Sequence, residues 1–404
     1  MPRPHGREWR HLMRLAHLAD AHLGFRQFQR LDAAGVNRRE MDVALAFRHA
    51  VDQVIDRKPD AIVIAGDLFH TVRPTNRAII EAFTQLQRLR HVLPAAPLIL
   101  IAGNHDTPRS LEAGSILKLM TSLGVDVVDD EPRHLAYPLL DLSVLAVPHA
   151  ALLRGRPEGG FRPDARARHN VLLMHPEIAG LFPEVMDYGG ARVEPAELRS
   201  AEWSYVALGH YHVVHEVAPR AWYAGSLEYT SPNLWGEVRE EERSGLGKGW
   251  LLSDLETGLV ERVALPPGRR IVELPWLDAD GVSAAELDAA IALRIASVPG
   301  GIAGAVVRLV VENVPRSLGH GLDHAALRAH KSAALHFQLD LRRPDPVSRA
   351  VGVGGPSRRQ LLPDLVADYL ARRPLDADLD RDRFVGLGRE TVEAVERDLT
   401  EGGA

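Results

Sequence analysis

Residues 98–106 read LILIAGNHD, four apolar residues that run through a small-residue turn into three polar side chains. A second stretch, AIVIAGDLFH (residues 61–70), likewise leads from an apolar run through a glycine to Asp67 and His70. Short apolar runs bounded by glycine are typical of strands that are buried on both faces of a parallel sheet. Because loops at the carboxyl ends of such strands form the binding sites of α/β sheets, the two polar ends indicate one shared site.

The surrounding sequence alternates strand patterns with helix patterns. Strands are expected at 13–20, 60–67 and 97–104, with amphipathic helices at 39–58 and 75–90 between them. Further strands are expected at 142–149, 169–176, 203–210, 220–226 and 249–265. This alternation predicts an α/β fold built on a layered sheet.

The pattern changes at residue 266. Residues 266–343 read as a compact βαβαβ unit, which predicts a small second domain after a first domain at 13–265. Residues 344–357 are rich in Gly and Pro and predict a linker to C-terminal helices at 358–404. Each helix carries an apolar stripe, made of Leu361, Leu362, Leu365, Val366, Tyr369 and Leu370 in the first and of Val392, Val395 and Leu399 in the second.

The composition is that of a globular protein, with 46% apolar and 25% charged residues among 404. A formal net charge of −6 gives no global nucleic-acid footprint, so any DNA contact would rest on local patches. The absence of cysteine excludes disulfides and thiolate metal ligands and favours a cytoplasmic location. No apolar run approaches the ~20 residues that span a bilayer. Residues 1–12, expected as a short extension, lack the apolar segment of a secretory signal.

Metal-ligand side chains follow five of the expected strands. They are Asp20 and His22, then Asp67, Asn104 and His175, and finally His210 and His212. Gly66, Gly103 and Gly209 precede polar residues at three of these ends, where glycine permits close approach of the chain. The D-x-H and H-x-H spacings let both side chains of each pair reach one cation, since alternate residues of an extended segment point the same way.

The type and number of these ligands predict the metal chemistry. Carboxylate, amide and imidazole groups without thiolate suit Mn²⁺, Fe or Zn. Seven ligands exceed the coordination of one ion but fit two, with Asp67 as the candidate bridge. Two such ions can hold a phosphate and activate a water molecule.

In this order the five segments resemble the motif blocks D-x-H, G-D, G-N-H-[DE], H and G-H-x-H of the metallophosphoesterase superfamily. Within it, GDLFHTVRP followed by GNHD is similar to the SbcD-type nucleases of DNA double-strand-break repair. The resemblance covers roughly residues 13–265. It implies a layered metallophosphoesterase β-sandwich flanked by helices, with a small α+β capping domain at 266–343 that binds DNA, and C-terminal helices.

Carried over position by position, the resemblance implies roles for particular residues. Asp20, His22, Asp67 and His212 would hold one ion, and Asp67, Asn104, His175 and His210 the other; two Mn²⁺ are expected, with Fe, Zn or Mg as alternatives. His105 would act at the scissile phosphate, assisted by His70, and Asp106 would orient a histidine. Arg73 and Arg109 are candidate phosphate contacts, although exposed arginines are as readily solvated.

Three functions compete for this pattern. The resemblance favours a Mn²⁺-dependent DNA exonuclease and endonuclease that processes DNA ends, because His70 stands where many other phosphoesterases resemble GDxxD. The alternative is a phosphoesterase for a small-molecule or nucleotide phosphodiester. A scaffold with a decayed site is disfavoured, because every ligand position is filled.

The resemblance also implies partners. These are DNA, a second copy of the chain in a homodimer, and an SbcC-like ATPase of the SMC/ABC type, with no membrane partner. The C-terminal helices would grip the ATPase through their apolar stripes. The alternative for these helices is that they fold on each other or on the catalytic core.

Overall fold

The computed structural model describes residues 13–108, 114–181, 190–344, 362–372 and 380–401. The chain forms two compact units, Met1–Arg343 and Pro344–Ala404. The predicted N-terminal extension, Arg109, residues 345–357 of the predicted linker and Leu361 lie outside the described residues.

The first unit contains two six-stranded sheets. The first has the order β14-β13-β1-β2-β3-β4, with β1 at Arg14–Leu18, β2 at Ala61–Ile64, β3 at Leu98–Ile101, β4 at Asp126–Val128, β13 at Gly249–Asp254 and β14 at Val260–Ala264. The second has the order β11-β12-β10-β7-β6-β5, with β5 at Arg133–Tyr137, β6 at Leu142–Val147, β7 at His169–Met174, β10 at Tyr205–Leu208, β11 at His215–Ala218 and β12 at Ala221–Tyr223. Strands β1 to β4 are parallel neighbours, and so are β6, β7, β10 and β12.

An apolar core joins the two sheets face to face. It contains Val63 and Ile101 from the first sheet and Val144, Val171 and Leu173 from the second, all fully buried. The other face of each sheet is covered as well, which explains why the strands are apolar without alternation.

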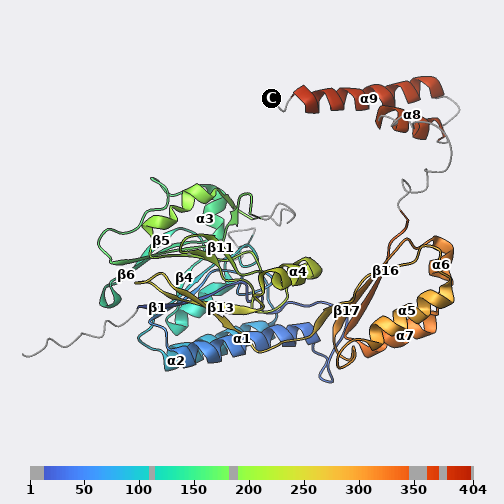
Figure 1. Ribbon diagram of the computed structural model, residues 1–404. Coiled ribbons are helices and arrows are strands. Elements are labelled where there is room, and N and C mark those ends of the chain that lie inside the picture. The colour runs from blue at the N-terminus through green and yellow to red at the C-terminus, as the bar shows by residue number, and fades with distance from the viewer. Residues whose placement is uncertain (1–12, 109–113, 182–189, 345–361, 373–379, 402–404) are drawn as a thin grey trace, which may run out of the picture. The chain divides into compact units, whose positions relative to one another are not determined.

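Helices cover the outer faces and complete the layers. Helix α1 (Arg38–Arg57) begins at Asn37, whose side chain accepts hydrogen bonds from two backbone amides of the first turn. It buries Phe47 and Val51 on the first sheet. Helix α2 (Asn76–Val92) lies beside α1 (Figure 1), and the 3-10 helix η2 (Ile116–Leu123) joins that layer. The short α3 (His149–Arg154) packs on the second sheet. The predicted α/β layered sandwich is therefore confirmed.

Residues 266–343 form a further sheet with helices and a core of their own within the first unit. Strand β17 (Val306–Glu312) pairs in parallel with all the others. The remaining elements are β15 (Ile271–Glu273), β16 (Leu277–Asp278), α5 (Ala284–Ala296), α6 (Arg316–His320), α7 (His324–Ala333) and β18 (His336–Leu341). We call this segment the cap. Its contacts with the preceding residues include α4 (Leu234–Ser244), whose Trp235 packs with Val306 and Leu335.

The second unit is a pair of helices, α8 (Leu362–Ala371) and α9 (Arg381–Glu401). They pack closely on each other: a Cβ added at Gly388 would lie 2.2 Å from Cδ1 of Leu370. Of the two arrangements left open by the sequence, the helices therefore adopt the one in which they contact each other. This pairing does not test whether they bind an ATPase.

Among the residues that the structure describes, no helix combines the length and apolar character needed to cross a bilayer.

Candidate metal centre

The predicted ligands lie together at the carboxyl ends of strands from both sheets. Asp20 and His22 follow β1, Asp67 follows β2, Asn104 follows β3, His175 follows β7, and His210 and His212 follow β10. Parallel strands end at the same edge of a sheet, and the two sheets are stacked with these edges together. The fold therefore brings all seven side chains to one place.

Four of these residues have a left-handed backbone conformation. The φ angles are 50° at Asp20, 47° at His22, 51° at Asp67 and 111° at His210. A non-glycine residue in a sparsely populated region costs on the order of 1–3 kcal/mol, and such residues cluster at functional sites. Their concentration around one cluster indicates a site built for function rather than a set of ordinary turns.

The loops at the centre pack too closely for a side chain at two glycines. A Cβ on Gly209 would lie 1.9 Å from the carbonyl oxygen of Ala65, and one on Gly103 would lie 2.1 Å from Oδ1 of Asp67. Nothing larger than glycine fits without moving these loops, which confirms the close approach predicted from the sequence.

One group of ligands surrounds His22. Its Nε2 lies 3.0 Å from Nε2 of His212 and 3.7 Å from Oδ2 of Asp67. Ligand atoms of Asp20, His22 and His212 all lie within 4.8 Å of one another. Two imidazole nitrogens and a carboxylate that converge in this way can share one cation.

A second group surrounds His175 on the other side of Asp67. Nε2 of His175 lies 3.3 Å from Oδ2 of Asp67 and 3.0 Å from Oδ1 of Asn104. Nδ1 of His210 lies 3.2 Å from the same Asn104 oxygen. Nδ1 of His175 donates a hydrogen bond to the carbonyl oxygen of Ala65 at 2.7 Å, which leaves Nε2 to face the cluster. Asp67 thus contacts both groups.

Burial and charge favour a cation at this place. Burial lowers the pKa of His22 and His212 well below the ordinary value and that of His210 to about 3, so these rings are neutral and offer lone pairs. Burial also raises the pKa of Asp20 to about 8. Burial would lower the pKa of His175, but Asp67 and Asp20 outweigh it and raise the value to about 9. Without metal, protons on Asp20 and His175 therefore compensate the buried negative charge, and divalent cations can replace them. The donor set fits a metal centre.

His105 and His70 lie at the edge of the first group. Their rings stack with centroids 5.0 Å apart, and Nδ1 of His105 donates to the carbonyl oxygen of His70 at 2.7 Å. Nδ1 of His70 lies 3.3 Å from Nδ1 of His22. The main-chain N–H of His105 donates to Oδ1 of Asp67 at 2.9 Å. Both histidines are half-buried, so they lie where the cluster meets solvent.

Asp106 has other partners than the predicted histidine. Its carboxylate accepts backbone N–H bonds from Leu68 at 3.1 Å, Phe69 at 3.0 Å and Gly103 at 3.3 Å. These bonds tie the loop after β2 to the loop after β3. Asp106 therefore holds the loops that carry Asp67 and Asn104, and the expectation that it orients a histidine is replaced by this role.

Only one of the two arginines predicted to contact phosphate lies within the described residues. Arg73 is exposed and lines a surface pocket together with Lys118. Arg109 lies outside the described residues. Their contact with phosphate stays a prediction.

Sequence reasoning did not single out several residues behind the cluster. Oγ1 of Thr230 lies 3.4 Å from Nδ1 of His212. The Lys248 ammonium donates to the main-chain oxygen of His212 at 3.1 Å. His149 is buried with its ring centroid 6.4 Å from that of His175. The polar run at 223–233, which contains Thr230, weakly indicates a loop near a binding site. The lysine in GLGKGW (residues 245–250) gives no such indication, because lysine is common in exposed turns.

A buried cluster of carboxylates, imidazoles and one amide, set at the strand ends of a two-sheet α/β sandwich, defines a metal-dependent phosphoesterase. A family model described as calcineurin-like phosphoesterase matches residues 13–214, which are 202 of the 404 residues. The chain belongs to the calcineurin-like phosphoesterase family, whose members use divalent metals.

Several curated proteins are similar to this chain. The DNA double-strand break repair protein Mre11 of Sulfurisphaera tokodaii is 30% identical over 209 residues, which cover 49% of this chain and 48% of that protein. The Mre11 protein of Methanopyrus kandleri is 29% identical over 287 residues, 65% of this chain and 57% of that protein. The SbcD component of the SbcCD nuclease of Bacillus subtilis is 29% identical over 313 residues, 67% of this chain and 74% of that protein. The match thus spans about half the length of the first two relatives.

Proposed function

We propose that this protein is a Mn²⁺-dependent DNA nuclease that processes DNA ends in double-strand-break repair, with exonuclease and endonuclease activity. The observation that carries the proposal is the meeting of two ligand groups at the single carboxylate of Asp67. The names of the similar proteins, a DNA double-strand break repair protein and a nuclease component, supply the substrate class. The alternative is a phosphoesterase for a small-molecule or nucleotide phosphodiester.

In this proposal the two groups hold one ion each. Asp20, His22, Asp67 and His212 form the first set, and Asp67, Asn104, His175 and His210 form the second. When bound, the two cations supply Lewis-acid chemistry, which neutralises phosphate charge and activates water. Mn²⁺ is the proposed native metal, and Fe, Zn and Mg are the alternatives for a thiolate-free site.

The protein's own groups position the substrate and move protons. His105 is the proposed general acid for the leaving oxygen, since the carbonyl of His70 fixes its Nδ1 and leaves Nε2 for proton exchange. The stacked His70 ring keeps His105 in place. Asp106 holds the loops at fixed separation through its three backbone hydrogen bonds.

Salt should separate the two candidate substrates. A DNA substrate contacts several phosphates and releases counterions on binding, so cleavage of a labelled recessed-end duplex should weaken steeply between about 50 and 200 mM salt. Hydrolysis of an aryl phosphodiester by the same Mn²⁺-loaded protein should change far less. Equal salt responses for the two substrates would favour the small-molecule alternative.

A homodimer is part of the proposal, and an apolar surface supports it. A pocket of about 520 Å³ is lined by the apolar residues Val72, Ile79, Ile116 and Leu119 and, at its edge, by Arg73 and Lys118 among others. Leu119 is 48% exposed. Exposed apolar patches of this kind mark interaction surfaces. In a two-fold dimer the same surface of both copies takes part, so this patch would be buried twice.

Leu119→Glu should therefore convert a dimer into a monomer, because the substitution would bury an unpaired carboxylate in an apolar interface. Light scattering after size exclusion measures the mass, and Mn²⁺ binding should be unchanged. The matched control is Leu259→Glu, since Leu259 is 72% exposed in the turn between β13 and β14. A Leu119→Glu protein that stays dimeric places the interface elsewhere.

The C-terminal helix pair is the proposed binding element for an SbcC-like ATPase of the SMC/ABC type. Because residues 344–404 form a compact unit of their own, their deletion should abolish association with the ATPase while Mn²⁺-dependent cleavage of short DNA persists. Co-purification and nuclease assays on one preparation measure both. Leu387→Asp provides a point variant, since Leu387 is 63% exposed on α9. A truncated protein that still bound the ATPase would assign the contact to the first unit.

A further inference from the structure

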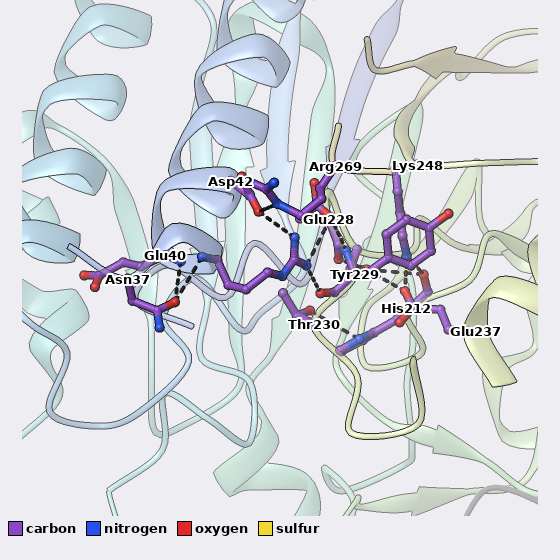
Figure 2. Close-up of polar contacts among 12 residues, drawn as sticks. Asn37, Glu40, Asp42, His212, Glu228, Tyr229, Thr230, Glu237, Lys248 and Arg269 are labelled. Carbon is purple, nitrogen blue, oxygen red and sulfur yellow. Dashed lines mark hydrogen bonds and ion pairs between the residues drawn. The ribbon is translucent and has the colours of Figure 1, made fainter. Parts of the chain in front are cut away.

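Lys248 is a buried cation directly behind the proposed metal ligand His212. Its side chain is 10% exposed, and its ammonium donates to the main-chain oxygen of His212 at 3.1 Å and to Oγ of Ser226 at 2.9 Å. Two buried carboxylates of α4, Glu237 and Glu241, accept from the same ammonium, Glu241 at 2.9 Å. Lys248 therefore links the His212 loop, the loop after β12 and helix α4 (Figure 2).

The loop after β12 is held from its other side as well. The Arg39 guanidinium of α1 is buried and donates to the main-chain oxygen of Tyr229 at 2.6 Å and to the Glu228 carboxylate at 3.2 Å. The same loop presents Thr230 to Nδ1 of His212, as Figure 2 shows. The main-chain carbonyl of His212 is thus bound by Lys248, and its ring lies within hydrogen-bond distance of Thr230. Both contacts belong to the same hydrogen-bonded network.

Helix α4 is fixed independently on its opposite face. Trp235 packs on the cap and donates to Gln338 at 3.1 Å, and Arg239 pairs with Glu273 of β15 at 3.1 Å. The helix that carries Glu237 and Glu241 to Lys248 is therefore held in place by the cap. Because Lys248 is bound to this fixed helix, it can restrain the loop that contains His212.

We infer that Lys248 is a positioning residue for His212: its ammonium fixes the His212 carbonyl so that Nε2 of the ring stays beside Nε2 of His22, where the proposed metal would bind. The inference rests on the proposed role of His212 as a ligand. Loss of a residue that hydrogen-bonds to a metal ligand commonly lowers metal affinity 10–100-fold. Loss of the Lys248 contact should therefore weaken one Mn²⁺ site about 10–100-fold without removing a ligand.

The experiment measures Mn²⁺ binding to metal-free, full-length protein by calorimetry, without substrate. Lys248→Met alone leaves Glu237 and Glu241 buried without their cation and is expected to destabilise the fold. A neutral triple variant, Lys248→Met with Glu237→Gln and Glu241→Gln, removes the ammonium and avoids that charge imbalance. Arg243→Met, at a 73% exposed position on α4 that pairs with Glu240, is the matched control and should bind Mn²⁺ as wild type does.

The triple variant should melt near the wild-type temperature and bind one Mn²⁺ normally and the other about 10–100-fold more weakly. Combined with His212→Ala, it should add no further loss, because both changes act on the same ligand. Wild-type affinity for both ions in the triple variant, or losses that add to that of His212→Ala, would overturn the inference.

Failure of the inference differs from failure of the proposed function. Wild-type protein that binds two ions and shows the Lys248 effect but cleaves no DNA would refute the nuclease assignment alone. DNA cleavage with a triple variant of unchanged Mn²⁺ affinity would refute the positioning role alone.

Discussion

Asp67→Asn is expected to lower Mn²⁺-dependent cleavage of a labelled duplex by far more than 100-fold. Groups that merely support a ligand are worth about 10–100-fold, and Asp67 contacts both ligand groups directly. An asparagine keeps the shape but loses the charge that two cations would share. Initial rates at saturating Mn²⁺, compared with wild type, measure the effect.

Thermal melting separates loss of metal from loss of fold. A metal that binds the native state at 100 times its Kd stabilises it by about 2.7 kcal/mol, so the wild-type protein should melt at a higher temperature with Mn²⁺. The Asp67→Asn protein should show little of this rise. Asp52→Asn is the control, because Asp52 forms an exposed ion pair with Arg88 away from the centre. Full turnover in the Asp67→Asn protein would refute the bridging role.

His105→Ala is expected to reduce turnover by ~10²–10⁴-fold, the usual contribution of general acid catalysis, with metal content intact. The contact between residue 105 and Asp67 is made by the main-chain N–H, so removal of the ring leaves it in place. Single-turnover cleavage and metal analysis of the same preparation distinguish the two quantities. His91→Ala, at an exposed position on α2, is the control. Loss of one ion in the His105→Ala protein would make His105 a ligand instead.

The sequence was most informative where a candidate metal-binding side chain directly follows a strand. Apolar runs ending on Asp67 and Asn104 predicted both the strands and the side on which their loops meet, because parallel strands share a carboxyl edge. The close packing around Gly103 and Gly209 was also predictable, since a glycine before a polar residue at a strand end indicates a crowded turn.

Contacts that depend on where the fold places a residue, rather than on the residue type, could not be predicted from the sequence. Asp106 was expected beside a histidine, but its partners are backbone amides, which carry no sequence signal. Lys248 precedes β13 in a glycine-rich turn, and only the pairing of β13 with β1 places it behind His212. The left-handed backbone at Asp20 and His22 is imposed by packing and is equally invisible in the residue types.

The helix pair illustrates a limit of a different kind. The apolar stripes of α8 and α9 predicted that each helix needs a partner, and periodicity alone cannot name it. The structure shows that each helix contacts the other, with Leu370 against Gly388. A helix pair can still present one outer face, so the ATPase proposal depends on exposed residues such as Leu387 rather than on the full stripes.

The central claim is that two metal ions flank Asp67, and an anomalous difference map from crystals grown with Mn²⁺ tests it most directly. The account predicts two peaks, one in contact with His22 and His212 and the other with His175 and His210, with the Asp67 carboxylate between them. A single peak, or a peak held by His22, His70 and His105, whose ligand atoms also lie within 4.8 Å of one another, would contradict it.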